Sequence, residues 1–289
     1  MEHWKMSPQT ALRLALLSFV VLLEAQRRTH EQDGGGGGGD GDGGDGDGDG
    51  GWSRGSHLSV DDEGPCNMDV LDGSSLSLRR FLDSYAYSRP AVITGLTDNA
   101  KFRSLCSKQN LLREYGDRQV RLSTANTYSY KKADVPFRHY VDVLLGPQSP
   151  DVLGSDTLYM FGDNNVSEWR NLLDFYRPPP FLLPGTGRAL SFGVAGPGTG
   201  VPFHWHGPGY SEVIYGRKRW FLYPPDEEPP FHPNASTLAW LRDVYPRLPP
   251  RQAPLQCTVR PGQVLYFPTR WWHATLNLDA GVFISTFLG

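Results

Sequence analysis

The sequence has few cysteines, a nearly balanced charge and no hydrophobic run long enough to span a membrane. Only 3 of its 289 residues are cysteine and none forms a CxxC pair, which excludes thioredoxin-type redox chemistry and argues against a zinc–thiolate site. Beyond residue 51, basic residues outnumber acidic ones by only about two, which is too small an excess for binding the phosphates of a nucleic-acid backbone. With 39% hydrophobic and 12% aromatic residues, the chain is typical of a globular protein.

The longest apolar run, Leu14–Leu23, follows Lys5 and Arg13. As a helix it would be about 15 Å long, which is about half the thickness of a bilayer core. The pattern predicts a signal peptide over residues 1–25 with cleavage after Ala25, and an uncleaved anchor is the alternative because Leu23 is not small. We therefore expect a protein of the endoplasmic reticulum lumen that has no stable membrane span after cleavage.

Two N-glycosylation sequons, at Asn165 and Asn234, agree with a luminal location. The chain ends without a KDEL-like signal, so retention would require a partner. Residues 33–51 contain only Gly and Asp. Because this tract has no apolar side chain to bury, we predict a disordered tail over residues 26–65.

The cysteines are Cys66, Cys106 and Cys257. In an oxidising compartment they allow at most one internal disulfide, and each of the possible pairings remains open. At least one thiol would then stay buried or pair with another chain.

From residue 66 to 289 the pattern indicates one domain of mixed helix and strand. Apolar spacing predicts helices at 78–85, 107–116 and 137–145, with Ser77 as a cap and Gly146 as a terminator. From 189 to 288, short strands between Pro and Gly turns predominate, with one helical stretch at 238–245. The predicted strands cover 91–93, 189–194, 202–206, 211–215, 219–223, 255–259, 264–267, 274–277 and 282–287. This favours an α+β fold in which N-terminal helices and strands flank a C-terminal β barrel or sandwich.

Three histidines fall within the β-rich part. His204 and His206 lie two apart on the strand predicted at 202–206, so both imidazoles would face the same way. His273 lies beside another predicted strand, and a barrel could bring it to the same point. Imidazole suits Fe, Zn, Cu and Ni, and three protein ligands leave coordination positions open. The alternative is that these histidines are simply packed or solvent-facing.

The chain also resembles the jumonji C (JmjC) hydroxylase family. The resemblance rests on RPAVITG at 89–95, GVPFHWH at 200–206, YGRKRWFLYPP at 215–225, and PGQVLYFP with WWHATLNL at 261–278. It runs from about residue 66 to the end of the sequence. It implies a double-stranded β-helix (cupin, or jelly-roll) barrel and descent from oxygenases that use Fe(II) and 2-oxoglutarate.

The resemblance also implies roles for individual residues. Lys218 matches the lysine that pairs with the distal carboxylate of 2-oxoglutarate, and a surface cation is the alternative. Tyr159 and Ser285 match positions that support the same carboxylate, or they are core residues of strands. Asn277 is either a partner that orients a ligand or a turn residue.

One ligand position departs from the family pattern, His-x-Asp/Glu…His. His204 and His273 match the two iron histidines, but His206 stands where the family has a carboxylate, which leaves the site one charge unit more positive. Val201 also stands where related hydroxylases often have Thr. We therefore expect His204, His206 and His273 to bind Fe(II), with Zn as the alternative, and we expect altered oxygen chemistry.

Two main functions, and a weaker third, follow from this departure. The first is a regulatory or interaction protein with a protein partner, a non-standard metal site and impaired oxygenase turnover. Trp271, Trp272 and Tyr210 would then line a partner groove, or belong to the core. The alternative is an active Fe(II)/2-oxoglutarate-dependent hydroxylase with a protein substrate. A three-histidine dioxygenase acting on a small molecule is a weaker third reading.

Overall fold

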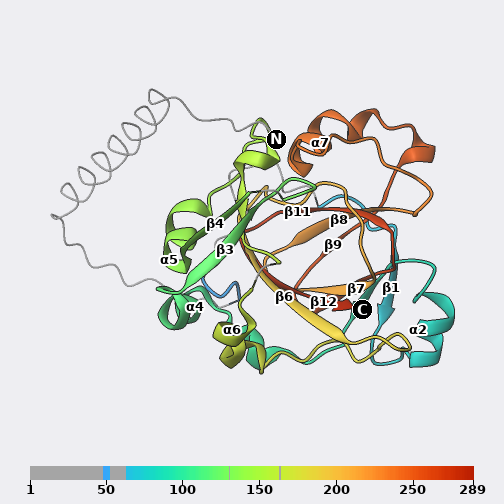
Figure 1. Ribbon diagram of the computed structural model, residues 1–289. Coiled ribbons are helices and arrows are strands. Elements are labelled where there is room, and N and C mark those ends of the chain that lie inside the picture. The colour runs from blue at the N-terminus through green and yellow to red at the C-terminus, as the bar shows by residue number, and fades with distance from the viewer. Residues whose placement is uncertain (1–47, 53–62, 130, 163) are drawn as a thin grey trace, which may run out of the picture. The chain divides into compact units, whose positions relative to one another are not determined.

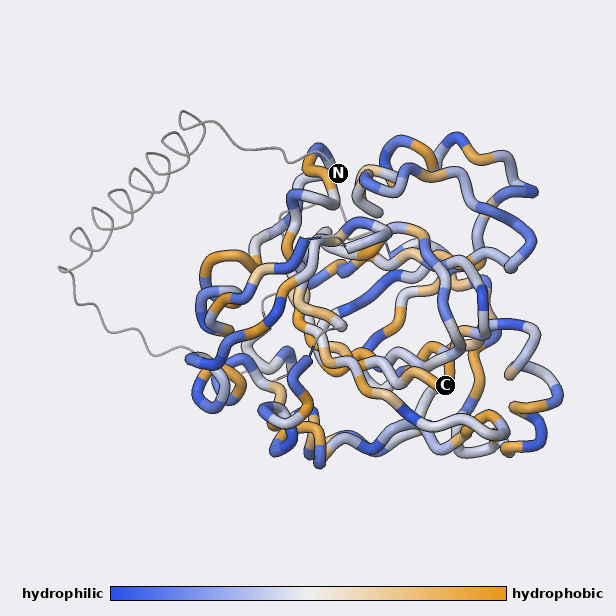
Figure 2. Tube along the Cα trace, in the orientation of Figure 1, coloured by the Kyte–Doolittle hydropathy of each residue, from blue (hydrophilic) through white to orange (hydrophobic). Residues whose placement is uncertain are grey.

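The computed structural model describes residues 48–52, 63–129, 131–162 and 164–289 (Figure 1). The predicted signal peptide and most of the predicted tail lie outside these residues. Within the described ranges, no helix is long and apolar enough to cross a bilayer. Figure 2 shows that short hydrophobic and hydrophilic stretches alternate along these ranges, as expected for elements with one buried face.

Three sheets form the framework of the fold. The largest has the strand order β1-β2-β10-β7-β12-β6, the second β11-β8-β9, and the third β4-β3-β5. The strand bounds are β1 Asp69–Asp72, β2 Ala91–Thr94, β3 Gln119–Thr124, β4 Lys132–Pro136, β5 Leu158–Tyr159, β6 Arg188–Ala195, β7 Gly209–Tyr215, β8 Lys218–Tyr223, β9 Leu255–Val259, β10 Gln263–Phe267, β11 Trp272–Asn277 and β12 Gly281–Leu288. The predicted α+β class with a C-terminal β-rich core is confirmed.

The six-stranded sheet and the β11-β8-β9 sheet enclose a common interior. Side chains from β7, β10 and β12 of one sheet and from β8 and β11 of the other line a single cavity. Strand β12 shows how the sequence builds this wall, because its side chains alternate between the two faces. Phe283, Ser285 and Phe287 line the cavity, whereas Val282 and Ile284 pack in an apolar cluster on the other face.

The helices surround this barrel (Figure 1). Their bounds are α2 Leu78–Ser84, α3 Ala100–Leu105, α4 Lys108–Tyr115, α5 Phe137–His139, α6 Val166–Leu173 and α7 Thr237–Asp243, with short 3₁₀ turns at Gly154–Asp156, Tyr245–Arg247 and Pro250–Gln252. As predicted, Ser77 caps α2 by accepting a hydrogen bond from the Arg80 amide. The helix predicted at 137–145 is only partly α-helical, because α5 continues as a π-helical turn over Tyr140–Leu144.

The prediction of a strand at 202–206 is wrong. In this stretch the chain makes one isolated antiparallel bridge, in which His204 and His273 exchange backbone hydrogen bonds of 3.1 and 2.8 Å. Pro202 and Pro208 lack the N–H groups that a longer ladder needs. We call residues 201–208 the histidine segment; it is irregular backbone joined to β11 by this bridge.

Residues 48–52 correct the prediction of a disordered tail over 26–65. The Trp52 side chain is only 2% exposed, packs in an apolar core cluster, and donates from Nε1 to the Cys106 carbonyl at 3.0 Å. Gly50 adopts a φ of +62°, and a side chain there would collide with the Tyr215 ring. Among the described residues, this docked segment lies before the predicted domain start at residue 66.

A disulfide joins Cys66 to Cys257 on β9 and so attaches the N-terminal part of the fold to the second sheet. Glu63 strengthens the same attachment by pairing with Arg217 at 2.8 Å. Cys106 remains as a buried thiol. The structure thus selects one of the pairings that the sequence left open.

Candidate metal centre

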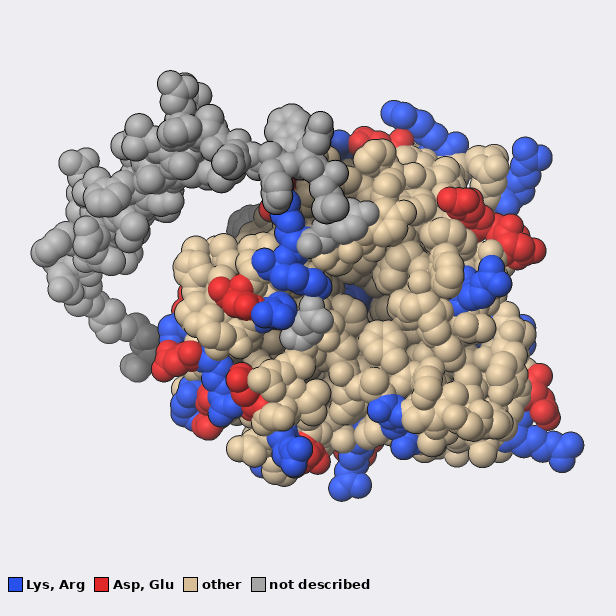
Figure 3. Space-filling model, in the orientation of Figure 1, with Lys and Arg blue, Asp and Glu red and all other residues tan. Residues whose placement is uncertain are grey.

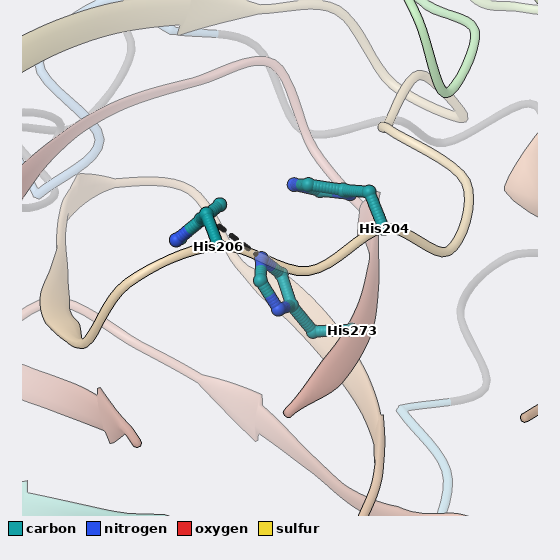
Figure 4. Close-up of side chains that lie close together, drawn as sticks. All are labelled: His204, His206 and His273. Atoms are coloured by element: carbon teal, nitrogen blue, oxygen red, sulfur yellow. Dashed lines mark hydrogen bonds between the residues drawn. The ribbon is translucent and has the colours of Figure 1, made fainter. Parts of the chain in front are cut away.

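Three histidines converge at the barrel interior. His204 and His206 come from the histidine segment and His273 from β11, and Figure 4 shows their rings turned towards one another. Each offers one nitrogen, and all three nitrogens lie within 4.8 Å of one another. The Nε2 atoms of His206 and His273 are 3.1 Å apart. The sequence prediction that these three side chains meet therefore agrees with the geometry, although the strand expected to carry two of them is absent.

Backbone carbonyls determine which nitrogen of each ring faces the cluster. The Nδ1 atoms of His204, His206 and His273 lie 2.9, 2.7 and 2.9 Å from the carbonyl oxygens of residues 202, 207 and 271. A carbonyl can only accept, so each Nδ1 carries the proton and each Nε2 presents a lone pair to the centre. Two lone pairs 3.1 Å apart repel each other, but this spacing matches the roughly 3–3.5 Å between nitrogens that share an ion at 2.0–2.1 Å. The three residues fit a divalent metal.

The electrostatic environment keeps these rings neutral. Burial lowers the pKa of His204 to about 4, and it lowers the pKa of His206 as well. The pKa of His273, which is only 2% exposed, lies well below its ordinary value, mainly through burial and also through the two neighbouring histidines. Because neutral imidazole is the form that binds metal, the site is ready for an ion at neutral pH.

A small cavity adjoins the histidines, and Lys218 of β8 lies in its wall. This side chain is 3% exposed, so the alternative reading as a surface cation is wrong. Its Nζ donates to the Tyr159 hydroxyl at 3.0 Å, and burial lowers the pKa of Lys218 and raises that of Tyr159. Asn277 Nδ2 lies 3.5 Å from the same hydroxyl and donates to the Thr199 carbonyl at 2.9 Å. Ser285 lines the cavity from β12.

The hydrogen bonds of Asn277 therefore go to Tyr159 and to the loop at Thr199, and not to a histidine.

Glu212, although next to the cavity residue Ser211 on β7, faces the other side of the sheet. There it accepts hydrogen bonds from Thr97, Asn99 and Tyr176, and burial raises its pKa. No carboxylate takes the place that His206 occupies within the described residues.

Comparison with known proteins agrees with this architecture. The sequence profile of the cupin-like domain family matches residues 79–286. The chain is 63% identical over 239 residues to JmjC domain-containing protein 8 of Homo sapiens, covering 83% of this chain and 90% of the relative. The chain belongs to the cupin-like JmjC family. The cupin fold and the resemblance to the JmjC family are thereby confirmed.

More distant JmjC proteins carry oxygenase names. One relative, 27% identical over 201 residues, is the 2-oxoglutarate and iron-dependent oxygenase JMJD4 of Gallus gallus, with 61% of this chain and 47% of the relative covered. Among solved structures, the ribosomal oxygenase YcfD of Escherichia coli in complex with cobalt and succinic acid shares 19% identity at a TM-score of 0.44. That similarity covers 74% of this chain and 52% of the other.

The 2-oxoglutarate role implied for Lys218 does not fit this JmjC cavity. The cavity has a volume of about 30 Å³, enough for about two water-sized groups, whereas 2-oxoglutarate has about ten non-hydrogen atoms. The Phe283 ring lies directly against the lysine, with its centroid 3.3 Å from Nζ. The ring therefore restricts the free space beside Lys218.

Sequence reasoning missed Phe283 and misplaced the exposed aromatic surface. Phe283 could have been found from the alternation along β12, since it lies two residues before Ser285 and faces the same way. Tyr210 and Trp271, predicted to line a partner groove or the core, are buried. Trp205 in the histidine segment is instead 50% exposed.

Proposed function

We propose that this protein is a metal-binding regulatory or interaction protein of the endoplasmic reticulum lumen in which the oxygenase chemistry of its ancestors is impaired. The observation that carries the proposal is the convergence of three neutral Nε2 atoms, each with its Nδ1 held by a backbone carbonyl. His204, His206 and His273 would hold Fe(II) or Zn(II). The ion would supply positive charge and open coordination positions.

The histidine segment links the metal site to the protein surface. His204 and His206 face inward, and Trp205 between them is exposed, with the Arg270 guanidinium 5.7 Å from its ring centroid. The Arg270 amide also donates to the His206 carbonyl at 2.9 Å. An ion shared with His273 would cross-link this irregular segment to β11 and thereby fix the presentation of Trp205 to a protein partner.

The face around the barrel opening is compatible with such a partner. Figure 3 shows a hollow near the centre of the face that it draws, in the orientation of Figure 1. Acidic and basic groups are both dispersed around it. A surface of mixed charge suits a protein partner better than a nucleic-acid backbone.

The luminal location has three supports. The apolar run at residues 14–23 is of signal-peptide length, and the sequons at Asn165 and Asn234 are useful only in the secretory pathway. The Cys66–Cys257 disulfide favours an oxidising compartment. Expression in a mammalian cell tests the luminal location. We expect the electrophoretic mobility of the protein to increase on endoglycosidase treatment. A band that does not shift, from protein in which Cys66 and Cys257 are reduced, would contradict this location.

The experiment for the regulatory role is hydrogen–deuterium exchange on purified protein with and without Zn(II). We expect added metal to protect the amides at 203–207, and to have no such effect in His206→Ala. His232→Ala, which changes an exposed histidine outside the site, is the control. Equal exchange with and without bound metal would contradict the link between the ion and this segment.

An active Fe(II)/2-oxoglutarate-dependent protein hydroxylase is the second candidate. It is favoured by the Lys218–Tyr159 hydrogen bond, which retains the cosubstrate-binding pair implied by the family resemblance. Succinate release that depends on Fe(II) and disappears in Lys218→Met would establish that activity and overturn the impaired-turnover proposal.

A further inference from the structure

The cavity beside the histidines contains hydrogen-bond donors without acceptors. Besides its bond to Tyr159, Lys218 forms no ion pair with any described carboxylate, and its ammonium faces the Phe283 ring. Ser211 Oγ and Trp220 Nε1 belong to residues that line the same cavity, are fully buried, and have no hydrogen-bond partner in the described part of the chain. Because buried donors are nearly always satisfied in native proteins, this set points to a missing acceptor.

The charge of the site points the same way. The described lining residues include Lys218 and three neutral histidines but no Asp or Glu. In the family pattern, a carboxylate at position 206 would contribute one negative charge to the metal centre. With His206 in its place, a divalent ion and Lys218 together leave the interior with excess positive charge, and burying such charge unpaired is costly.

The size of the cavity limits what the acceptor can be. Phe283 pairs with Gly193 across β12 and β6, and a side chain on Gly193 would meet the Phe283 ring at 2.3 Å. The missing side chain at 193 thus allows the ring to lie against the sheet and beside Lys218. The remaining space of about 30 Å³ holds about two or three water-sized groups, so it accommodates a group of about three non-hydrogen atoms at most.

We propose that this cavity binds a small monoanion, of the size of formate, on Lys218 beside the three histidines, and that Phe283 excludes 2-oxoglutarate from it. The anion accepts hydrogen bonds from Lys218, with Ser211 and Trp220 as the nearby donors. It supplies the negative charge that His206 does not. The inference deepens the proposed function at the same site, but it stands on the cavity and its donors.

The test is NMR of ¹³C-labelled formate and, separately, of 2-oxoglutarate titrated into the purified full chain, in chelator-treated and in Zn(II)-loaded form. We expect formate to bind the wild-type protein and 2-oxoglutarate not to compete with it. Lys218→Met should weaken formate binding by roughly tenfold or more, since it removes the charged donor. Phe283→Ala should admit 2-oxoglutarate with an affinity at least about tenfold above that of the wild type.

Ile284→Ala is the matched control for Phe283→Ala, because it shortens a buried side chain of the same strand on the opposite face. It should leave both titrations unchanged, and Phe283→Val provides a milder opening of the cavity should the alanine variant fail to fold. Displacement of formate by 2-oxoglutarate in the wild type, or full formate binding by Lys218→Met, would overturn the inference. Metal loading is measured on the same samples. A protein that binds Zn(II) but not formate refutes only the anion site. A protein that binds formate but not Zn(II) refutes only the proposed metal site.

Discussion

Replacing Lys218 by Met should stabilise the protein, even though the lysine is among the most buried residues in the barrel. The ammonium is 3% exposed and makes one hydrogen bond, to a neutral hydroxyl. Removing a buried charge saves a desolvation cost of several kcal/mol. Against this, the variant loses a cation–π contact with Phe283 of about 2 kcal/mol and a charged hydrogen bond of about 1.5–3 kcal/mol. Packing of the thioether adds to the gain, so we expect a net stabilisation of about 1–3 kcal/mol.

The assay is urea unfolding of the chelator-treated wild type and variant. Burial lowers the pKa of Lys218 below its ordinary value of 10.5, so the unfolded chain binds more protons at this position than the folded chain does. The stability of the wild type therefore rises as pH increases towards 10.5, and the advantage of the variant shrinks. Arg219→Met is the comparison at the neighbouring position, because it also removes a buried cation, but one outside the cavity that donates to Gln256 at 2.7 Å. A Lys218→Met variant less stable than the wild type at pH 7 would refute the reasoning that the lysine is kept for binding.

Other changes test the rest of the structure. Replacing Cys66 or Cys257 by Ser opens a bond across 191 residues and should lower the unfolding free energy by about 4–5 kcal/mol; native protein in which Cys66 reacts with a thiol reagent would contradict the pairing. Trp52→Ala should cost about 3–5 kcal/mol in the same urea assay, and a cost below about 1 kcal/mol would mean that residues 48–52 do not dock. Because the pKa of His204 is lowered from 6.5 to about 4, the unfolded chain takes up that proton first, so the metal-free protein should lose stability as pH falls from 6.5 towards 4. Thermal unfolding followed across this range checks the sign, and stability that rises on acidification would contradict it.

The residues of the site could largely be located from sequence, but the space between them could not. The spacing of His204 and His206, and the motif around His273, were enough to predict a shared point. The ring of Phe283 was not anticipated, because an aromatic residue on a strand is ordinarily core. Its position depends on Gly193, which becomes its neighbour only through the pairing of β12 with β6.

The errors at the N-terminal end have a similar cause. A tract of Gly and Asp has no apolar surface of its own, so disorder was the natural prediction for residues 26–65. One tryptophan at its end, Trp52, has enough apolar surface to dock residues 48–52 once the core cluster near Cys106 exists. The pairing of Cys66 with Cys257 likewise depends on which segments the barrel brings together.

The most direct test of the central claim is the metal content and coordination of the purified protein. Elemental analysis after anaerobic loading with Fe(II) or Zn(II), combined with X-ray absorption, should find about one ion per chain with three nitrogen ligands at about 2.0–2.1 Å. His273→Ala should lose the ion, whereas His139→Ala, which changes an exposed histidine outside the site, should keep it. A wild type without bound metal, or a His273→Ala variant that retains it in full, would contradict the account.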